Sequence, residues 1–374
     1  MSLIELRREL HAHPELAFAE HRTTELIMDR LRAAGLEPKV LPGGTGVVCD
    51  IGTVGRLVGL RADIDALPIQ DLKHVPYRST VDGACHGCGH DAHTAILLGA
   101  AAELATQQLP GRIRLIFQPG EETLPGGAVS VVAAGVLEGV ERIFALHCDP
   151  RLDTGQVGLR VGPITAACDH IEIELNGPGG HTARPHMTVD LVYALGLVIT
   201  ELPGLLSRRV DPRSALSLVW GAVESGRAIN AIPSSGRVKG TLRVFDREAW
   251  DGAEPLLREL VEQIVAPTGA KAEISYVRGV PPVVNDADAV AMQRRAVLRG
   301  LAPAALAQTV QSMGGEDFAW YLERVPGALA RLGVRRPGTS AFDLHQGTFD
   351  LDEDALEVGV RYTVELARTA LLAE

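Results

Sequence analysis

Short apolar segments of strand length alternate with helical patterns along the first 150 residues of this chain. The apolar runs cover residues 46–50, 57–62, 113–117 and 143–146, and the helical patterns cover residues 3–11, 20–34 and 92–104. Strands that alternate with helices form a mainly parallel sheet with helices on its faces, because each parallel crossover needs a long connection. We therefore expect an α/β domain here.

A different pattern begins near Pro163. Strand, helix, strand, strand, helix and strand patterns follow one another at Ile171–Leu175, Val189–Leu206, Ala215–Val223, Arg237–Phe245, Arg247–Val265 and Lys271–Val277. This β-α-β-β-α-β order is that of a ferredoxin-like unit. We expect an inserted α+β domain over residues 165–278, with residues 1–164 and 279–374 forming one discontinuous domain around it.

The charge balance limits the classes of partner. The chain carries 36 Lys and Arg residues against 47 Asp and Glu residues, a formal charge of −11. This argues against nucleic acid or an anionic membrane as the main partner. No uninterrupted apolar run reaches the ~18–20 residues that span a bilayer, and the segment MSLIELRREL lacks the apolar stretch of a signal peptide. We expect a cytoplasmic protein without a nucleic-acid or membrane partner.

The densest group of ligand-type side chains is the segment from Cys85 to His93, which reads CHGCGHDAH. It precedes an alanine-rich helical pattern, for which Asp91 is an N-cap candidate. Three interpretations are open. Cys85 and Cys88 match a redox Cys-x-x-Cys pair; the segment could be half of a zinc knuckle, although no matching second pair follows; or Cys88 and His90 contribute to a mixed site that other loops complete.

Other polar side chains stand at the ends of predicted strands. Glu121 and Glu122 follow the strand at 113–117, Asp63 and Asp65 follow 57–62, and His147 follows 143–146. The carboxyl ends of parallel strands meet at one edge of a sheet, where sites form. Adjacent glutamates are usually solvated because like charges repel, but divalent cations would neutralise them. The patterns are thus compatible with a metal site or with an ordinary charged edge.

Five motifs in a fixed order resemble those of a known family. They are Leu60–Pro68 (LRADIDALP), Cys88–Asp91 (CGHD), Gln118–Glu122 (QPGEE), Gly179–His181 (GGH) and Glu316–Phe318 (EDF). In this order they resemble the metal-dependent aminoacylase/carboxypeptidase-type amidohydrolases, in particular the branch with hippurate hydrolases, indole-acetyl-amino-acid hydrolases and N-acetyl-diaminopimelate deacetylases. The resemblance runs from His11 to His345, nearly the whole chain.

The resemblance implies a three-layer, phosphorylase/hydrolase-like catalytic domain with two divalent metal ions. The ligands that it implies are Cys88, His90, Glu122, His147 and His345. Glu121 would be the general base that activates the attacking water, and Asp63 would lie behind the ligands and orient them. A thiolate ligand favours Zn²⁺, whereas relatives are often described with Mn²⁺, so both metals stay open.

The resemblance also assigns roles in the inserted domain, which it identifies as a dimerisation lid. His181 would stabilise the oxyanion of the tetrahedral intermediate. Asn230 and Arg243 would hold the carboxylate of the substrate, to which a guanidinium can donate two parallel hydrogen bonds, and His186 would line the lid. From the residues alone, an exposed strand position is an equally good interpretation of Arg243.

These inferences lead to one expected activity and two alternatives. We expect a homodimeric amidohydrolase that cleaves small N-acyl amino acids, either hippurate-like or with N-acetyl or indole-acetyl groups. A dipeptidase or carboxypeptidase could use the same dinuclear site. An alternative from another class is a thiol redox protein centred on Cys85 and Cys88.

Overall fold

The computed structural model describes residues 1–373, which divide into two compact units. Of these, the first unit comprises residues 1–164, 284–310 and 317–373, and the second comprises residues 165–283 and 311–316. The second unit thus ends at Val283 and not at the predicted residue 278. The reason is that its last strand, β13 (Lys271–Val280), continues to pair with β8 (Ala167–Asn176) as far as Val280.

The residues 311–316 were expected in the first unit but cluster with the second. Within the second unit, Ser312 forms a bridge with Thr165, and Arg243 donates a hydrogen bond to the carbonyl oxygen of Met313. These backbone contacts explain why this short segment leaves the domain to which its sequence neighbours belong.

The first unit contains an eight-stranded, mainly parallel sheet. Its strands in spatial order are β1 (Lys39–Val40), β2 (Val47–Ile51), β4 (Arg112–Gln118), β3 (Leu57–Asp63), β5 (Val140–Asp153), β16 (Gly327–Arg335), β6 (Val157–Leu159) and β15 (Leu306–Gln308). The central strands β4, β3, β5 and β16 are parallel to their neighbours in this group. This confirms the expected α/β class.

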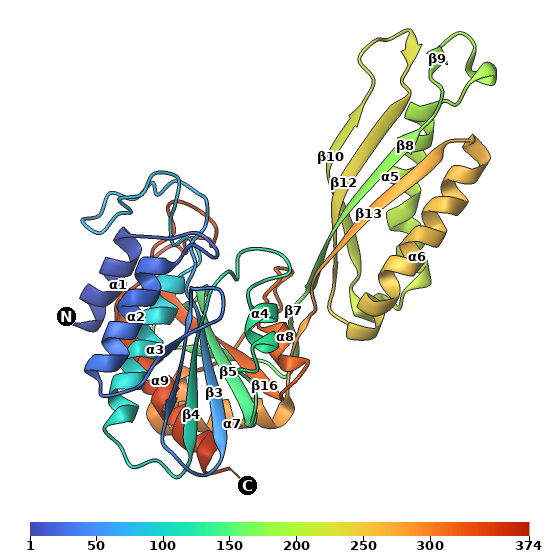
Figure 1. Ribbon diagram of the computed structural model, residues 1–374. Coiled ribbons are helices and arrows are strands. Elements are labelled where there is room, and N and C mark those ends of the chain that lie inside the picture. Colours follow the sequence, from blue (N-terminus) through green and yellow to red (C-terminus); the bar gives the residue numbers. More distant parts are fainter. Residues whose placement is uncertain (374) are drawn as a thin grey trace. The chain divides into compact units, whose positions relative to one another are not determined.

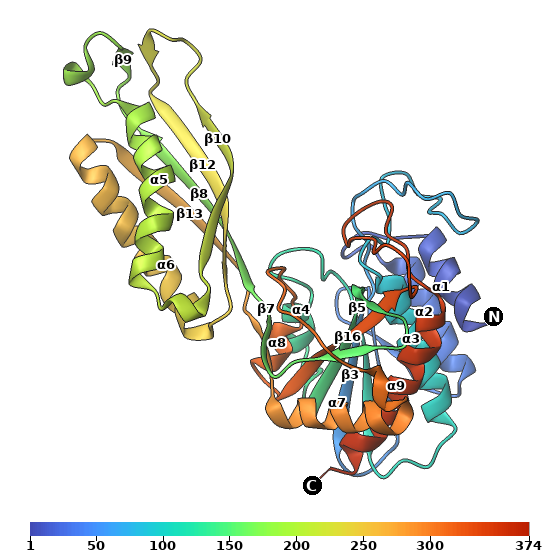
Figure 2. The same cartoon turned by 180° about the vertical axis from the view of Figure 1, so that it is seen from behind.

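The helices of this unit are α1 (Leu3–Ala12), α2 (His21–Ala33), α3 (His90–Ala105), α4 (Ala128–Ala133), α7 (Ala287–Gly300), α8 (Ala319–Leu322) and α9 (Asp354–Leu371). Helices α3, α9 and α7 lie behind the sheet in Figure 1 and in front of it in Figure 2. Helix α1 begins with a capping box, in which Ser2 and Glu5 each accept a hydrogen bond from the other's backbone N–H. Two short strands, β7 (Gly162–Thr165) and β14 (Val283–Asn285), pair with each other.

Helix α3 is buried on nearly every side, which explains its lack of a polar face. It packs against α9 at Gly99, where an added Cβ would lie 2.8 Å from Val360. The prediction that Asp91 caps this helix is wrong. The N-cap is Gly89, with φ +87°, and Asp91 lies in the first helical turn, where it pairs with Arg7.

The second unit has the predicted β-α-β-β-α-β order. Its elements are β8, α5 (Leu191–Arg209), β10 (Ser217–Ser225), β12 (Ser235–Val244), α6 (Arg247–Val265) and β13, with the short strands β9 (Gly180–His181) and β11 (Ala231–Ile232). The four long strands form an antiparallel sheet in the order β10-β12-β8-β13. Helices α5 and α6 pack against this sheet (Figure 1).

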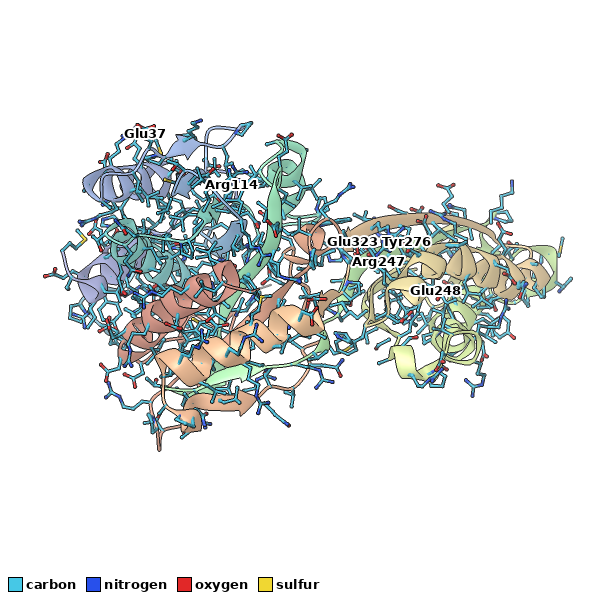
Figure 3. The ribbon with its side chains drawn as sticks, turned by 90° about the horizontal axis from the view of Figure 1, so that it is seen from below. Glu37, Arg114, Arg247, Glu248, Tyr276 and Glu323 are labelled. Carbon is cyan, nitrogen blue, oxygen red and sulfur yellow. The ribbon has the colours of Figure 1, made fainter. Side chains whose placement is uncertain are left out.

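A buried carboxylate anchors the second unit. Asp169 on β8 accepts hydrogen bonds from the indole of Trp250, at 2.8 Å, and from the hydroxyl of Tyr276. The guanidinium of Arg247 lies 4.8 Å from the centre of the Trp250 ring. Figure 3 labels Arg247 at the start of α6 and Tyr276 on β13. These contacts tie α6 to both central and edge strands of the sheet.

Helix α5 is the one helix of residues 1–373 that is long and apolar enough to cross a membrane, judged by length and composition only. Its sequence is nevertheless not an uninterrupted apolar run, because Glu201 and polar residues such as Thr200 lie within it. One side of α5 is buried within the unit, through Leu191, Ala194, Leu195, Val198, Leu202 and Leu206.

Candidate metal centre

Four neighbouring strands place polar residues side by side in the first unit. Asp63 at the end of β3 is in register with Gln118 at the end of β4. Because Arg61 is in register with Ala145 of β5, Asp63 lies at the level of His147, and His147 is in register with Arg331 of β16. Strand β5 continues to Asp153, so His147 lies within the strand and not after it, as the apolar run had indicated.

The five predicted ligands come together at this edge. The side-chain ligand atoms of Cys88, His90 and His147 lie within 4.8 Å of one another, and so do those of Cys88, Glu122 and His345. The Cys88 Sγ is 3.5 Å from His147 Nε2, and Glu122 Oε1 is 3.8 Å from His90 Nε2 and 3.5 Å from His345 Nε2. Cys88 therefore belongs to two groups of potential ligands at once.

Two histidines each direct their Nε2 toward the other candidate ligands. The Nδ1 of His90 bonds to the carbonyl oxygen of Asp65 at 2.9 Å, and the Nδ1 of His147 bonds to that of Cys148 at 2.8 Å. A hydrogen bond from Nδ1 to a carbonyl leaves Nε2 with its lone pair, the arrangement found in metal-binding histidines. Among the described residues, the buried atoms without a hydrogen-bond partner include His90 Nε2 and Glu122 Oε1. The donor set and these orphaned atoms fit bound cations.

The electrostatics of the site are consistent with that fit. Burial, together with the nearby Asp65 and Asp63, raises the pKa of Glu122 to about 7 against the opposing effect of His90. Burial lowers the pKa of His90, but Asp63, Asp65 and Glu122 outweigh it and bring the pKa to about 10. Protons therefore bind tightly where the negative charges of several carboxylates repel one another. A divalent cation at the same place would offset this repulsion.

Asp63 lies next to the candidate ligand His90, with 3.7 Å between Asp63 Oδ2 and His90 Nε2, but makes its closer histidine contact with His93. The Nδ1 of His93 donates to Asp63 Oδ1 at 2.6 Å, and its Nε2 accepts from the backbone N–H of Cys148 at 2.8 Å. Burial disfavours ionisation of Asp63, but His90, Arg61 and His93 hold its pKa well below the usual range. Asp63 is thus an ionised anchor that ties His93 to the strand carrying His147.

Asp65 makes contacts that sequence reasoning did not assign. Its Oδ2 accepts a hydrogen bond from the backbone N–H of Glu122 at 2.9 Å, and its Oδ1 lies 3.4 Å from His90 Nδ1. The Asp-x-Asp spacing in the segment LRADIDALP was the available signal, because alternate residues point to one side. Which carboxylate serves which ligand could be seen only in three dimensions.

A buried ion network supports Asp63 from the other side. Arg61 donates to Asp63 Oδ2 and to Asp317 Oδ1, each at 2.7 Å, and to Gln118 Oε1 at 2.9 Å. Asp317 also accepts from the backbone N–H of Ala128 at 2.9 Å. Asp317 belongs to the EDF motif, so the network gives that motif a structural role at the back of the site.

His345 reaches the site from a distant part of the chain. Its backbone N–H donates to the carbonyl of Gly87 at 2.8 Å, and its φ of +60° lies in the left-handed region, which a residue with a Cβ rarely adopts. Strained backbone of this kind concentrates at functional sites. The imidazole is about half exposed, and burial together with His90 lowers its pKa.

Cys85 and Cys148 lie outside the predicted ligand set. Cys85 belongs to a separate buried group with His11 and Asp71, and its Sγ is 3.6 Å from Lys73 Nζ. Cys148 packs against Gly89, where an added Cβ would lie 2.9 Å from its Sγ. All five cysteines are buried and free of disulfide bonds.

His11 lies between two buried carboxylates behind the helix that begins at His90. Its Nδ1 is 2.7 Å from Asp91 and its Nε2 is 3.3 Å from Asp71. Burial lowers the pKa of His11, but Asp91 and Asp71 outweigh it and raise the pKa to about 9. In the unfolded chain the pKa returns to about 6.5. The stabilisation is therefore complete below pH 6.5 and is lost as pH rises through 9.

We accordingly expect a pH-dependent cost for the substitution His11→Gln. In the metal-free protein, the difference in unfolding free energy between wild type and variant should shrink by about 3 kcal/mol from pH 6 to pH 9.5. Denaturant titrations at both pH values measure this difference. A difference that does not change with pH would show that His11 is not held in its charged form.

The remaining predicted residues lie in the second unit. His181 on β9 is in register with Ala231 of β11, and the carbonyl of Asn230 accepts from the N–H of Thr182, so His181 and Asn230 are neighbours. Arg243 pairs with Cys168, at the opposite end of the sheet from Ser235 and Asn176. Eight residues separate Ser235 from Arg243 on β12, roughly 26 Å of strand. His186 is exposed in a short 3₁₀ turn, Pro185–Met187.

Comparison with known proteins decides the family. A family model described as peptidase family M20/M25/M40 matches residues 59–369. The chain belongs to this family. It is therefore a hydrolase of the M20 type, with the expected α/β fold, and the resemblance inferred from the five motifs is confirmed.

Similar proteins differ in length and in name. The chain is 51% identical over 367 residues to a putative glutamate–cysteine ligase 2-3 of Rhodococcus jostii. The matched segment covers 98% of this chain but only 46% of the length of that protein. It is 40% identical to an N-acetylcysteine deacetylase of Bacillus subtilis, over 98% of this chain and 96% of that one. The structure of the Bacillus subtilis YXEP protein, described as a dinuclear metal-binding M20 peptidase, matches with a TM-score of 0.87 and 37% identity, over 100% of this chain and 98% of that one.

Proposed function

We propose that this M20 hydrolase cleaves N-acyl amino acids at a site that holds two divalent metal ions, Zn²⁺ or Mn²⁺. The observation that carries the proposal is the pair of buried, orphaned atoms His90 Nε2 and Glu122 Oε1, 3.8 Å apart and adjoining Cys88, His147 and His345. The dinuclear description of the structural relative supports the number of ions. When bound, the cations would activate water and polarise the amide carbonyl of the substrate.

The chain's own residues would divide the remaining work. Glu121 Oε2 lies 4.0 Å from His90 Nε2, beside the ligand atoms. We assign Glu121 to take a proton from the attacking water and to return it to the amine nitrogen that leaves. Cys88 belongs to both groups of ligand atoms, so its thiolate would help to hold the ions together with His90, Glu122, His147 and His345.

The roles proposed for the second unit follow its geometry. His181 would stabilise the oxyanion, with Asn230 beside it, and His186 would line the lid. Arg243 stands at the other end of the sheet, roughly 26 Å of strand away, which is farther than a small N-acyl amino acid can span. We therefore assign Arg243 to the substrate carboxylate and propose that His181 and Asn230 reach the same substrate from the other subunit of a homodimer. A homodimer formed through the lid unit and a cytoplasmic location are further parts of this proposal.

N-acetylcysteine is our first choice of substrate, because it is the substrate named for one relative. With Zn²⁺ or Mn²⁺ added, we expect free cysteine and acetate in equal amounts, with a kcat/KM at least 10-fold above that for a dipeptide of similar size. The assay compares N-acetyl, N-benzoyl and indole-acetyl amino acids with dipeptides under one set of conditions. Faster dipeptide cleavage would favour the carboxypeptidase or dipeptidase alternative, and no cleavage in any arm would refute the proposal.

A further inference from the structure

Two buried carboxylates hold the backbone on either side of Glu121. The N–H of Gly120 donates to Glu20 Oε1 at 2.9 Å, and the N–H of Glu122 donates to Asp65 Oδ2 at 2.9 Å. Glu121 therefore lies between two anchored peptide groups. Asp65 also contacts His90, so it belongs to the site already described, whereas Glu20 touches none of the predicted ligands through a recorded contact.

Glu20 stands at the start of helix α2, where a side chain commonly accepts a hydrogen bond from a backbone N–H of the first helical turn. It is the N-cap residue of α2, but it makes no side-chain hydrogen bond to its own helix. Its side chain is fully buried, and its Oε2 has no hydrogen-bond partner among residues 1–373. Burying a polar oxygen without a partner costs stability. A residue selected only to cap the helix would not be expected to reach away from the helix to the loop that carries Glu121.

The segment that carries Glu20 is itself fixed against the site. The N–H of Ala66, next to Asp65, donates to the carbonyl of Glu15 at 2.8 Å. Phe18 adopts φ +61°, an unusual value for a residue with a Cβ. Its ring covers Gly120 so closely that a Cβ on Gly120 would lie 2.6 Å from Phe18 Cζ. The Phe18 ring and the Glu20 carboxylate therefore both contact Gly120, the residue directly before Glu121.

We propose that Glu20 is a positioning residue, which holds Gly120 and thereby sets the place of the Glu121 carboxylate relative to the reacting amide. The proposal rests on the proposed function, because it requires that Glu121 is the general base. A misplacement of about 1 Å can cost on the order of 10²-fold in rate. Glu20 acts through the backbone of the loop and does not touch the substrate.

Two substitutions at Glu20 separate a positioning role from a merely structural one. Glu20→Ala removes the acceptor for the Gly120 N–H, whereas Glu20→Gln keeps an acceptor oxygen and the volume. Burial raises the pKa of Glu20 to about 7, so near neutral pH the wild-type side chain is partly a neutral acid, which glutamine resembles. We expect kcat to fall by about 30- to 100-fold in Glu20→Ala, with KM within about threefold and an unchanged metal content, and to return to within about threefold of wild type in Glu20→Gln.

A second readout does not depend on activity. Amide hydrogen exchange of the metal-free protein, followed in peptides that cover residues 118–124, should become at least 10-fold faster at Gly120 in Glu20→Ala but not in Glu20→Gln. Asp169→Asn is the matched control: Asp169 is also a buried carboxylate that accepts a backbone N–H, from Gly279 at 2.9 Å, but it lies in the second unit. It should lower stability and leave kcat and exchange at Gly120 unchanged.

The kinetic and exchange measurements together test whether Glu20 positions the loop. Wild-type kcat in Glu20→Ala, a change in KM alone, or failure of glutamine to restore kcat would overturn it, and so would unchanged exchange at Gly120. If the wild-type enzyme cleaved no acyl amino acid, the proposed function would fail, and the exchange data would still show whether Glu20 holds the loop. If Glu20→Ala did not fold, Glu20→Asp, which keeps the carboxylate but withdraws it from the Gly120 N–H by one methylene, should lower kcat in the same direction with KM unchanged. Wild-type kcat and wild-type exchange at Gly120 in Glu20→Asp would overturn the proposal.

Discussion

Replacing Glu121 with glutamine should lower kcat by about 10²- to 10⁴-fold, the contribution usual for general acid–base catalysis. Glutamine keeps the size of the side chain but cannot take a proton from water. Because Glu121 is not one of the five proposed ligands, the variant should still bind two metal ions per chain. Steady-state kinetics on the best acyl amino acid, combined with metal analysis of the same preparation, tests both parts.

The neighbouring glutamate provides the control for this result. Glu122 Oε1 faces His90 and His345, so Glu122→Gln should lose metal as well as activity. An active Glu121→Gln enzyme would show that Glu121 is not the base. Loss of metal from Glu121→Gln would show instead that the roles of the two glutamates had been exchanged.

The substitution Cys88→Ser should have the other large effect. The Cys88 thiol lies 3.5 Å from His147 Nε2 and belongs to both groups of ligand atoms. A serine hydroxyl is a much poorer ligand for a soft divalent metal than a thiolate. We expect the affinity for both ions to fall by at least 100-fold and turnover to fall to background at micromolar metal. Equilibrium titration with Zn²⁺ and with Mn²⁺ measures the affinity.

Cys85→Ser is the matched control for this substitution. Cys85 lies only three residues earlier but faces Lys73, His11 and Asp71. Metal content and turnover should stay near wild type in this variant. A thiol redox protein would behave in the opposite way, with full loss in Cys85→Ser and no effect of a chelator.

Local pattern was sufficient for most of the fold. The helix over Arg247–Val265 was predicted with the bounds that the structure has, because its apolar residues repeat at the helical period and Asp246 caps it. The predicted strand at 143–146 was too short, since β5 continues to Asp153 by pairing with β16. The length of β5 could not be predicted from the local sequence, because its partner strand lies some 180 residues later in the chain.

In the candidate site, too, local motifs were predicted from the sequence and long-range contacts were not. The five candidate ligands lie close together, and strand ends and short motifs marked them in the sequence. The contacts behind them could not be predicted: His93 links Asp63 to the backbone of Cys148, and Glu20 reaches Gly120 from a segment 100 residues earlier. Such hydrogen bonds depend on how separate segments pack. Likewise, nothing in the pattern around Arg243 showed that it lies at the opposite end of its sheet from His181.

The stoichiometry of metal binding tests the central claim most directly. The purified chain, stripped with a chelator and titrated with Zn²⁺ or Mn²⁺, should bind two ions, and His345→Ala should bind the second at least 100-fold more weakly. A wild-type chain that retains no divalent metal at micromolar concentrations would contradict the assignment of these five side chains as ligands.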